Sequence, residues 1–267
     1  MTRDEKLQEI LQKKEYDVDD LVTIVELLRL PGGCPWDREQ THKSLRRDMI
    51  EETYEVIEAI DSEDAVLLRE ELGDALLQIV MHARIEEEEG RATFREIAGD
   101  VCRKMIHRHP HVFGEVKADS VAEVLSNWES IKSEEKSRNT VTDKLNAIPR
   151  QFPALMRAAK IGKKAGMMDF PDVSSALEKL KEESREVEEA LLDGGKEAIF
   201  EEMGDLLFTA ANLARKAGVD PEEALTFATD KFVRRFEKVE KMAADMNKGL
   251  ENLTLEEKEV LWQRAKK

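Results

Sequence analysis

The sequence is poor in cysteine, in aromatic residues and in long apolar runs, and each shortage excludes a class of protein. Two of its 267 residues are cysteine, Cys34 and Cys102, which is too few for a disulfide framework and is typical of the reducing cytoplasm. Aromatic residues make up 5%, which favours aliphatic helix packing over a β-sandwich or barrel. No apolar run reaches the roughly 18 residues of a membrane span and no signal segment is present, so we expect a soluble cytoplasmic protein without a membrane partner.

Basic residues are also in deficit. The chain has 42 Lys and Arg against 58 Asp and Glu, a net charge of −16. A chain this acidic repels phosphate backbones, so we expect no nucleic-acid partner. A small anionic ligand would instead need bound cations or a few well-placed Lys and Arg side chains.

Helical periodicity dominates the chain, and no segment shows the alternation of a strand, so we predict an all-α fold. A polar stretch that ends at Pro149 separates two halves. We therefore predict one domain at residues 1–135, a linker at 136–148 and a second domain at 149–267. The expected helices cover 18–30, 40–60, 64–89, 94–107, 120–136, 150–165, 173–191, 196–216, 221–244 and 254–266.

The two halves repeat each other. Residues 51–84 align without a gap with residues 182–215, at a constant offset of 131. This period is far longer than the repeat of a solenoid, so the alignment indicates two tandem copies of one domain.

Each copy carries the same spacing of carboxylates: E-E-x-x-E, then fifteen residues, then E-x-x-D. Residues three apart share a helix face, and a polar break lies midway between the two motifs, so each copy predicts an antiparallel helical hairpin. The inner pair of acids and the outer pair share one midpoint, which places them opposite one another about 12–17 Å from the turn. The facing acids are Glu52, Glu55, Glu71 and Asp74 in the first copy, and Glu183, Glu186, Glu202 and Asp205 in the second.

Three interpretations of these acids are open. A solvated, charge-rich helix face would explain one motif alone. A di-iron bundle uses Glu-x-x-His pairs, and Asp74 and Asp205 stand where the histidines would be. The acids lie within or beside apolar stripes in both copies, where like charges are costly without a cation. We therefore expect a Mg²⁺ site in a helical bundle, with Mn²⁺ as an alternative ion.

Further motifs accompany the acids. The first half contains "GGCPWDREQTHKSL", "EETYEVIEAI", "EELGDALLQIVMHAR", "RHPHVFG" and "NWESIK", and the second contains "EESREVEEAL", "EEMGDLLF", "DKFVRRFEKVE" and "LWQRAKK". With these, nearly the whole chain resembles the MazG nucleoside triphosphate pyrophosphohydrolases. The resemblance implies two helical-bundle domains of the all-α NTP pyrophosphatase type. It also implies Mg²⁺-dependent hydrolysis of nucleoside triphosphates to monophosphate and pyrophosphate, in control of nucleotide pools or removal of aberrant nucleotides.

The resemblance also implies roles for individual residues. Glu51 and Glu182 would position or deprotonate the attacking water. The expected substrate-binding residues are Lys231, Arg235 and Trp262 in the second domain, and Arg108, Trp128 and Lys132 in the first. Because Asp100 stands where the second copy has Lys231, we expect the second domain to be the main catalytic one.

Two further expectations concern assembly and a rival function. Short helical hairpins often complete their bundle with a partner chain, so we expect a homodimer. The rival function is a non-catalytic Mg²⁺–nucleotide sensor or regulatory bundle, which would bind nucleotide without releasing pyrophosphate.

Overall fold

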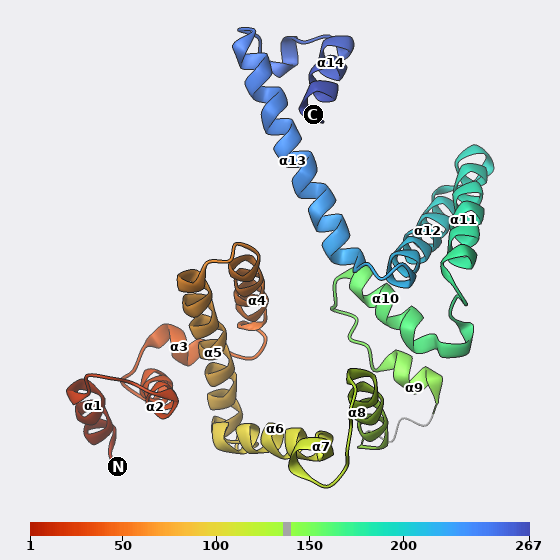
Figure 1. The fold of residues 1–267 in the computed structure, drawn as a ribbon. Helices are drawn as coiled ribbons and strands as arrows, with labels where there is room; N and C mark the ends of the chain where they lie inside the picture. Colours follow the sequence, from red (N-terminus) through yellow and green to blue (C-terminus); the bar gives the residue numbers. More distant parts are fainter. Residues whose placement is uncertain (136–139) are drawn as a thin grey trace. The chain divides into compact units, whose positions relative to one another are not determined.

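Every regular element that the structure describes is a helix, which confirms the predicted all-α class. The structure is a computed structural model that describes residues 1–135 and 140–267 (Figure 1). The chain divides into two compact units, Met1–Lys132 and Ser133–Lys267. In chain order the elements are α1 (Arg3–Gln12), α2 (Val18–Arg29), α3 (Pro35–Glu39), α4 (Arg46–Asp61), α5 (Ala65–Glu88), α6 (Phe94–Arg108), α7 (Pro110–Phe113), α8 (Val121–Glu135), α9 (Val141–Asn146), α10 (Ala154–Ala165), η1 (Gly166–Met168), α11 (Val173–Asp193), α12 (Lys196–Lys216), α13 (Pro221–Asp245), η2 (Leu250–Asn252) and α14 (Leu255–Ala265).

The first unit is built on the hairpin of α4 and α5. The carboxylate of Asp64 accepts hydrogen bonds from the backbone N–H groups of Val66 and Leu67 and so starts α5 directly after the turn. Helix α2 packs on α5 and buries Val25 against Val80 in the core of this unit. The hairpin predicted from the carboxylate spacing is therefore present, with its apolar side on α2.

A buried arginine fixes the loop that leads from α2 into this hairpin. Arg29 is 9% exposed, and its Nη2 lies 2.8 Å from a carboxylate oxygen of Glu88 on α5. Its Nη1 donates to the backbone carbonyls of Asp37 and Gln40. One buried cation thus satisfies a carboxylate and two loop carbonyls, and it attaches residues 37–40 to α5.

The second unit repeats the hairpin with α11 and α12. Gly194 ends α11 and Gly195 precedes the first residue of α12, as the sequence predicts for a tight turn. Helix α10 packs across α12 at Gly162, where a Cβ atom would overlap the side-chain oxygen of the buried Asn212. The glycine therefore allows these two helices to approach closely.

Helix α13 leaves this hairpin and ends in a core of its own. Val239 and Ala243 of α13 pack against Leu253 and against Leu261 and Ala265 of α14. Figure 1 shows α13 diverging from α11 and α12, with α14 folded back on its far end. Helices α13 and α14 thus form an arm that extends from the α11–α12 hairpin.

The structure corrects one predicted helix and adds others. The prediction of helix at 40–60 is wrong for residues 40–45, where Thr41 N–H donates to Ser44 Oγ at 2.9 Å and Ser44 Oγ donates to Gln40 Oε1 at 2.7 Å. These local side-chain bonds form a turn in place of the first helical turn. The sequence analysis missed α1, α3, α7 and α9, all of six residues or fewer except α1.

The predicted linker at 136–148 contains a short helix, α9, which the sequence did not predict. Helix α9 begins with a capping box between Thr140 and Asp143. Residues 136–139 of the predicted linker lie outside the described residues. The boundary between the two compact units falls between Lys132 and Ser133.

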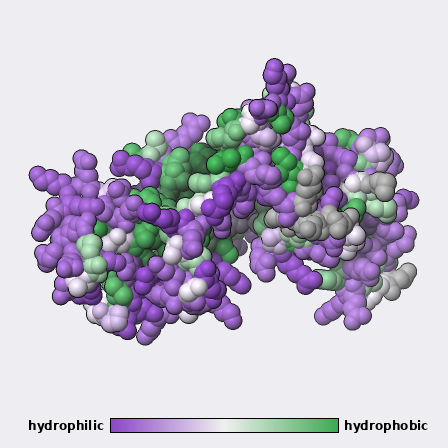
Figure 2. All heavy atoms as spheres, turned by 90° about the horizontal axis from the view of Figure 1, so that it is seen from below, coloured by the Kyte–Doolittle hydropathy of each residue, from purple (hydrophilic) through white to green (hydrophobic). Residues whose placement is uncertain are grey.

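The surface exposes many apolar side chains among its charges, as Figure 2 shows for one face. They include Tyr54 and Ile57 on α4, and Phe200, Leu207 and Phe208 on α12, which are 39–83% exposed. None of the described helices combines the length and apolar character that a membrane crossing requires.

Candidate functional site

The first unit gathers three of its four predicted acids. Glu52 and Glu55 on α4 and Glu71 on α5 each offer a carboxylate oxygen within 4.8 Å of the others. Burial, followed by the charges of Asp74, Glu55 and Glu71, raises the pKa of Glu52. Burial and the charges of Glu55 and Asp74 likewise raise the pKa of Glu71. The fourth acid, Asp74, is thus close enough to act on both, and the group repels itself without a cation.

The second unit gathers the equivalent acids around a buried carboxylate. Glu183 and Glu186 on α11 and Glu202 on α12 again offer oxygens within 4.8 Å of one another. Glu183 is 4% exposed, and its Oε2 has no hydrogen-bond partner among the described residues. Burial raises the pKa of Glu186, against the opposing charge of Lys179. A buried carboxylate oxygen with no donor, surrounded by two further carboxylates, fits a hard divalent cation.

The fourth predicted acid of the second unit, Asp205, is exposed and is not part of the three-acid group. Asp74 is likewise outside the three-acid group of the first unit. The structure therefore brings together Glu183, Glu186 and Glu202.

Lys179 is a site residue that the sequence analysis missed. Its Nζ lies 2.7 Å from Glu182 and 2.9 Å from the buried Glu183, one helical turn further along α11. These two hydrogen bonds raise the pKa of Lys179, and the bond to Lys179 lowers the pKa of Glu182. The signal was present in the sequence, because a Lys four residues before Glu183 faces it on a helix.

The two acids predicted to act on water are each paired with a cation of their own helix. Glu182 is bound to Lys179, and Glu51 accepts a hydrogen bond from Arg47 Nε at 2.8 Å. Arg47 is 84% exposed, so the pair of Glu51 is a surface pair that contributes little to stability. Both acids flank the metal-binding candidates without joining them.

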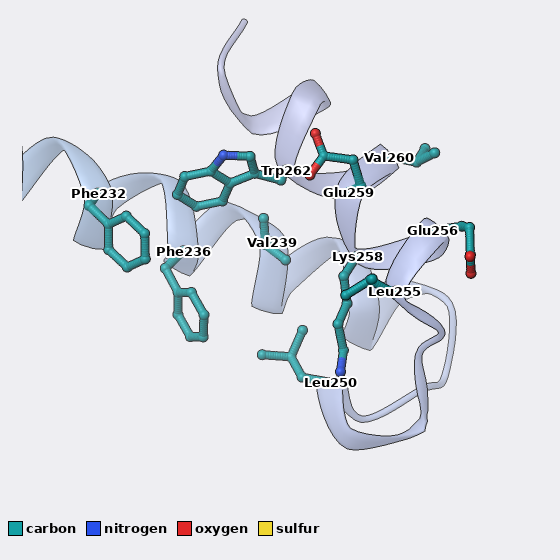
Figure 3. Close-up of a pocket in the computed structure, with 10 residues that line it drawn as sticks. All are labelled: Phe232, Phe236, Val239, Leu250, Leu255, Glu256, Lys258, Glu259, Val260 and Trp262. Carbon is teal, nitrogen blue, oxygen red and sulfur yellow. The ribbon is translucent and has the colours of Figure 1, made fainter. Parts of the chain in front are cut away.

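The predicted substrate-binding residues of the second unit lie on the arm. Trp262 of α14 packs against Phe232 of α13, with ring centres 4.9 Å apart. Both rings line a groove of about 910 Å³ between α13 and α14, in which Figure 3 shows Trp262 facing Phe232 and Phe236. Lys231 lies with its Nζ 5.5 Å from the ring centre of Phe227, on its own helix.

Lys231 and Arg235 lie on α13, and the acids lie on α11 and α12, as the predicted helices require. No described residue of α13 or α14 forms an ion pair with Glu183, Glu186 or Glu202. That these cations share one site with the acids stays a prediction.

The predicted substrate-binding residues of the first unit do meet one another. The guanidinium carbon of Arg108 lies 5.3 Å from the ring centre of Trp128, and Lys132 Nζ lies 4.2 Å from it. Both distances are within the range of cation–π attraction. The indole of Trp128 thus already has two cations against it.

Known protein families match this chain in the two segments that contain the hairpins. The family model described as the MazG nucleotide pyrophosphohydrolase domain matches the chain twice, at residues 40–113 and 171–240. The chain belongs to the MazG family. Each MazG segment contains one complete set of the four acids, and the second also contains Lys231 and Arg235.

Relatives extend the likeness over nearly the full chain. It is 43% identical over 257 residues to a protein of Escherichia coli K12 named nucleoside triphosphate pyrophosphohydrolase, covering 94% of this MazG chain and 97% of the relative. It is also 43% identical over 250 residues to a nucleoside triphosphate pyrophosphohydrolase/pyrophosphatase MazG of Thermotoga maritima, covering 93% and 95%. A Mycobacterium tuberculosis protein with the name nucleoside triphosphate pyrophosphohydrolase is 40% identical over 57% of this chain and 46% of its own length.

Proposed function

We propose that the chain is an enzyme that hydrolyses nucleoside triphosphates to nucleoside monophosphate and pyrophosphate, with Mg²⁺ held by the acids of the second unit. The observation that carries this proposal is the convergence of Glu183, Glu186 and Glu202, together with a buried oxygen of Glu183 that has no hydrogen-bond partner among the described residues. The names of the nearly full-length relatives support the same reaction.

The acids of the second unit would hold the ion through Glu183, Glu186 and Glu202, with Asp205 as a fourth ligand and Mn²⁺ as an alternative ion. When bound, Mg²⁺ supplies positive charge to the phosphate oxygens and lowers the pKa of a bound water. Glu182, which accepts a hydrogen bond from Lys179, would orient the attacking water or accept its proton.

Three residues of the arm would hold the nucleotide. Lys231 and Arg235 are four apart on α13 and present two cations on one face, which suits a chain of phosphates. Trp262 offers an indole face to a base, and stacking of this kind tolerates any base.

We assign catalysis mainly to residues 149–267. The first domain, residues 1–135, has the same acids, with Glu51 in the position of Glu182, and its own substrate candidates Arg108, Trp128 and Lys132. It has Asp48 where the second unit has Lys179, and Asp100 where the second unit has Lys231. Both differences remove positive charge that a triphosphate would use.

We further propose a cytoplasmic homodimer. The reducing cytoplasm agrees with the low cysteine content. Each hairpin exposes apolar side chains, among them Ile57 at 45% and Leu207 at 53%, and a second copy would cover them. Light scattering of the purified chain measures this state.

A product-resolved assay tests the reaction. Incubation of the full chain with each nucleoside triphosphate and Mg²⁺ should release monophosphate and pyrophosphate, and Glu202→Gln should abolish most of this activity. Release of diphosphate and orthophosphate would refute the assignment. Saturable nucleotide binding without pyrophosphate release would favour the sensor function in its place.

A further inference from the structure

Two histidines meet at the open end of the α4–α5 hairpin. The four acids of this hairpin are spaced symmetrically about Glu63, and the same count places position 44 opposite position 82. His42 lies in the turn at residues 40–45, just before α4, and its Nδ1 lies 2.7 Å from Nδ1 of His82 on α5. The acid group therefore lies between two points at which the helices are joined: the connection at residues 62–64 and the histidine pair.

The two rings share a hydrogen bond in their common plane. The ring planes differ by 4°, and the ring centres are 5.0 Å apart. The facing nitrogens are closer than two stacked rings can approach, so the rings lie edge to edge. Such a contact needs one proton between the nitrogens, because two lone pairs repel each other and so do two N–H groups. The contact therefore depends on the number of protons that the pair holds.

Glu86 determines which ring donates. His42 Nε2 lies 2.8 Å from Glu86 Oε1, and Arg91 Nη2 lies 2.5 Å from the same oxygen. A hydrogen bond from Arg91 lowers the pKa of Glu86 to about 2, so Glu86 is ionised at neutral pH and can only accept. His42 must then carry a proton on Nε2. In a neutral His42 this leaves Nδ1 as the acceptor, and His82 donates from its own Nδ1.

The pair accepts one additional proton but not two. A first added proton makes His42 a cation beside Glu86, and His82 then changes from donor to acceptor, so the bond is kept. A second added proton puts hydrogen on both Nδ1 atoms, which must separate. Burial, followed by the charge of His42, lowers the pKa of His82 from 6.5. The neutral His82 ring therefore contributes stability that is present above pH 6.5 and is lost as the pH falls below it toward the lowered pKa.

The charges that face the pair come from α5 and from the loop after it. Arg91 Nη2 lies 3.2 Å from His42 Nε2 and opposes its protonation, whereas Glu86 favours protonation of both rings. Helix α2, which packs on α5, faces it with Glu26 and Arg29, and both pair with other side chains of α5. Among the described residues, Glu86 and Arg91 thus set the charge balance at the pair.

We infer that His42 and His82 form a proton-sensitive clasp, which holds the turn at residues 40–45 on α5 at neutral pH and releases it when both Nδ1 atoms carry a proton. Release frees the open end of the first hairpin. Val173 and Leu213 stand at the two positions in the second copy, at the offset of 131. The clasp is therefore a pH response of the first unit, and it does not depend on the proposed reaction.

Hydrogen exchange of the full chain measures release of the turn. The reporters are the amides of Ser44 and Leu45, whose N–H groups donate to Thr41 within the turn. Their protection factors correct for the intrinsic effect of pH on exchange. One additional proton bound on opening changes the equilibrium by about tenfold per pH unit, so protection should fall by up to that amount per unit below about pH 6.5. Protection that stays constant from about pH 7.5 to 5.5 would overturn the inference.

Two variants of His82 separate the proton from the contact. The amide of His82→Asn donates to or accepts from His42 Nδ1 but does not titrate, so protection should stay within about twofold of wild type at neutral pH and lose its dependence on pH. His82→Leu removes the bond and should lower protection about fivefold or more at neutral pH. The matched control is His109→Asn, because His109 Nδ1 contacts the carbonyl of Met105 on its own helix, and it should behave as wild type. Full pH dependence in His82→Asn would contradict the clasp.

The NMR chemical shifts of the histidine ring nitrogens test the proton count directly. At neutral pH, one of the two facing Nδ1 atoms should be protonated and the other bare. Two bare Nδ1 atoms would indicate a bound transition metal in place of the proton, and that result would refute the clasp.

Discussion

Lys179 acts as a built-in counter-ion for the acid group of the second unit, and its removal gives a quantitative prediction. Its ammonium is bound to Glu182 and to Glu183, whose side chain is 5% exposed. Lys179→Met keeps most of the apolar stem and removes the charge. The variant leaves the buried carboxylate with two like charges and no cation among its neighbours.

The size of the effect lies between two limits. Exposed ion pairs contribute up to about 1 kcal/mol, and removing one partner of a buried pair costs about 3–5 kcal/mol. Glu183 is buried but Lys179 is 37% exposed, so its charge is partly screened by water. We expect the metal-free variant to lose about 1–2 kcal/mol in free energy of unfolding, which lowers Tm by about 2–8 °C for a chain of this size.

The same free energy should appear in the binding of Mg²⁺ with the opposite sign. Because the ion and the ammonium neutralise the same carboxylates, the wild-type ion must displace Lys179 and the variant ion need not. Mg²⁺ should therefore bind the variant about 5- to 30-fold more tightly. At saturating Mg²⁺, the Tm values of variant and wild type should converge.

Calorimetry of thermal unfolding measures the change in Tm, and titration with Mg²⁺ measures the change in affinity. Lys181→Met is the matched control, because Lys181 lies on the same helix, is 59% exposed and pairs only at the surface with Glu178 at 2.8 Å. It should change neither quantity. Unchanged Tm and unchanged Mg²⁺ affinity in Lys179→Met would refute the role of Lys179 as counter-ion.

Two further predictions concern the first unit. A hydrogen bond from Arg91 lowers the pKa of Glu86 from 4.5 to about 2. Glu86 therefore contributes stability that is present above its ordinary pKa and is lost as the pH falls from about 4.5 to 2. The free energy of unfolding of Glu86→Gln should decline less steeply across that range, and a decline equal to that of the wild type would contradict the assignment. Arg29→Met leaves two loop carbonyls without their buried cation and leaves Glu88 with Arg84 alone, and it should cost about 2–4 kcal/mol in urea unfolding. A loss below about 0.5 kcal/mol would show that water replaces the guanidinium.

The sequence predicted the elements that depend on local pattern. Helical periodicity located ten helices, and the shared midpoints of the acids predicted both hairpins and the gathering of Glu183, Glu186 and Glu202. The turn at 40–45 was missed because Thr41 and Ser44 replace helical bonds by side-chain bonds, which periodicity does not register.

The direction of α13 could not be predicted from local sequence pattern, because it depends on contacts between residues far apart in the chain. It depends on the hydrogen bond from the backbone N–H of Met156 to Glu222, two residues 66 positions apart, and on the burial of Pro221 at the start of α13. The sequence alone therefore predicted separate helices for the acids and for Lys231 and Arg235, and it could not predict the direction in which α13 leaves the hairpin.

The two copies share the four hairpin acids and differ in the charge of two positions that carry lysine in the second copy. Every one of the four hairpin acids is repeated at the offset of 131, whereas Lys179 and Lys231 correspond to Asp48 and Asp100. Each change replaces a positive charge by a negative one, whereas Arg235 corresponds to Lys104, which keeps the positive charge. Under the proposed function, a triphosphate would be attracted less strongly by the first unit than by the second. The proposed assignment of catalysis to the second unit therefore depends on the cations that accompany its acids and not on the acids alone.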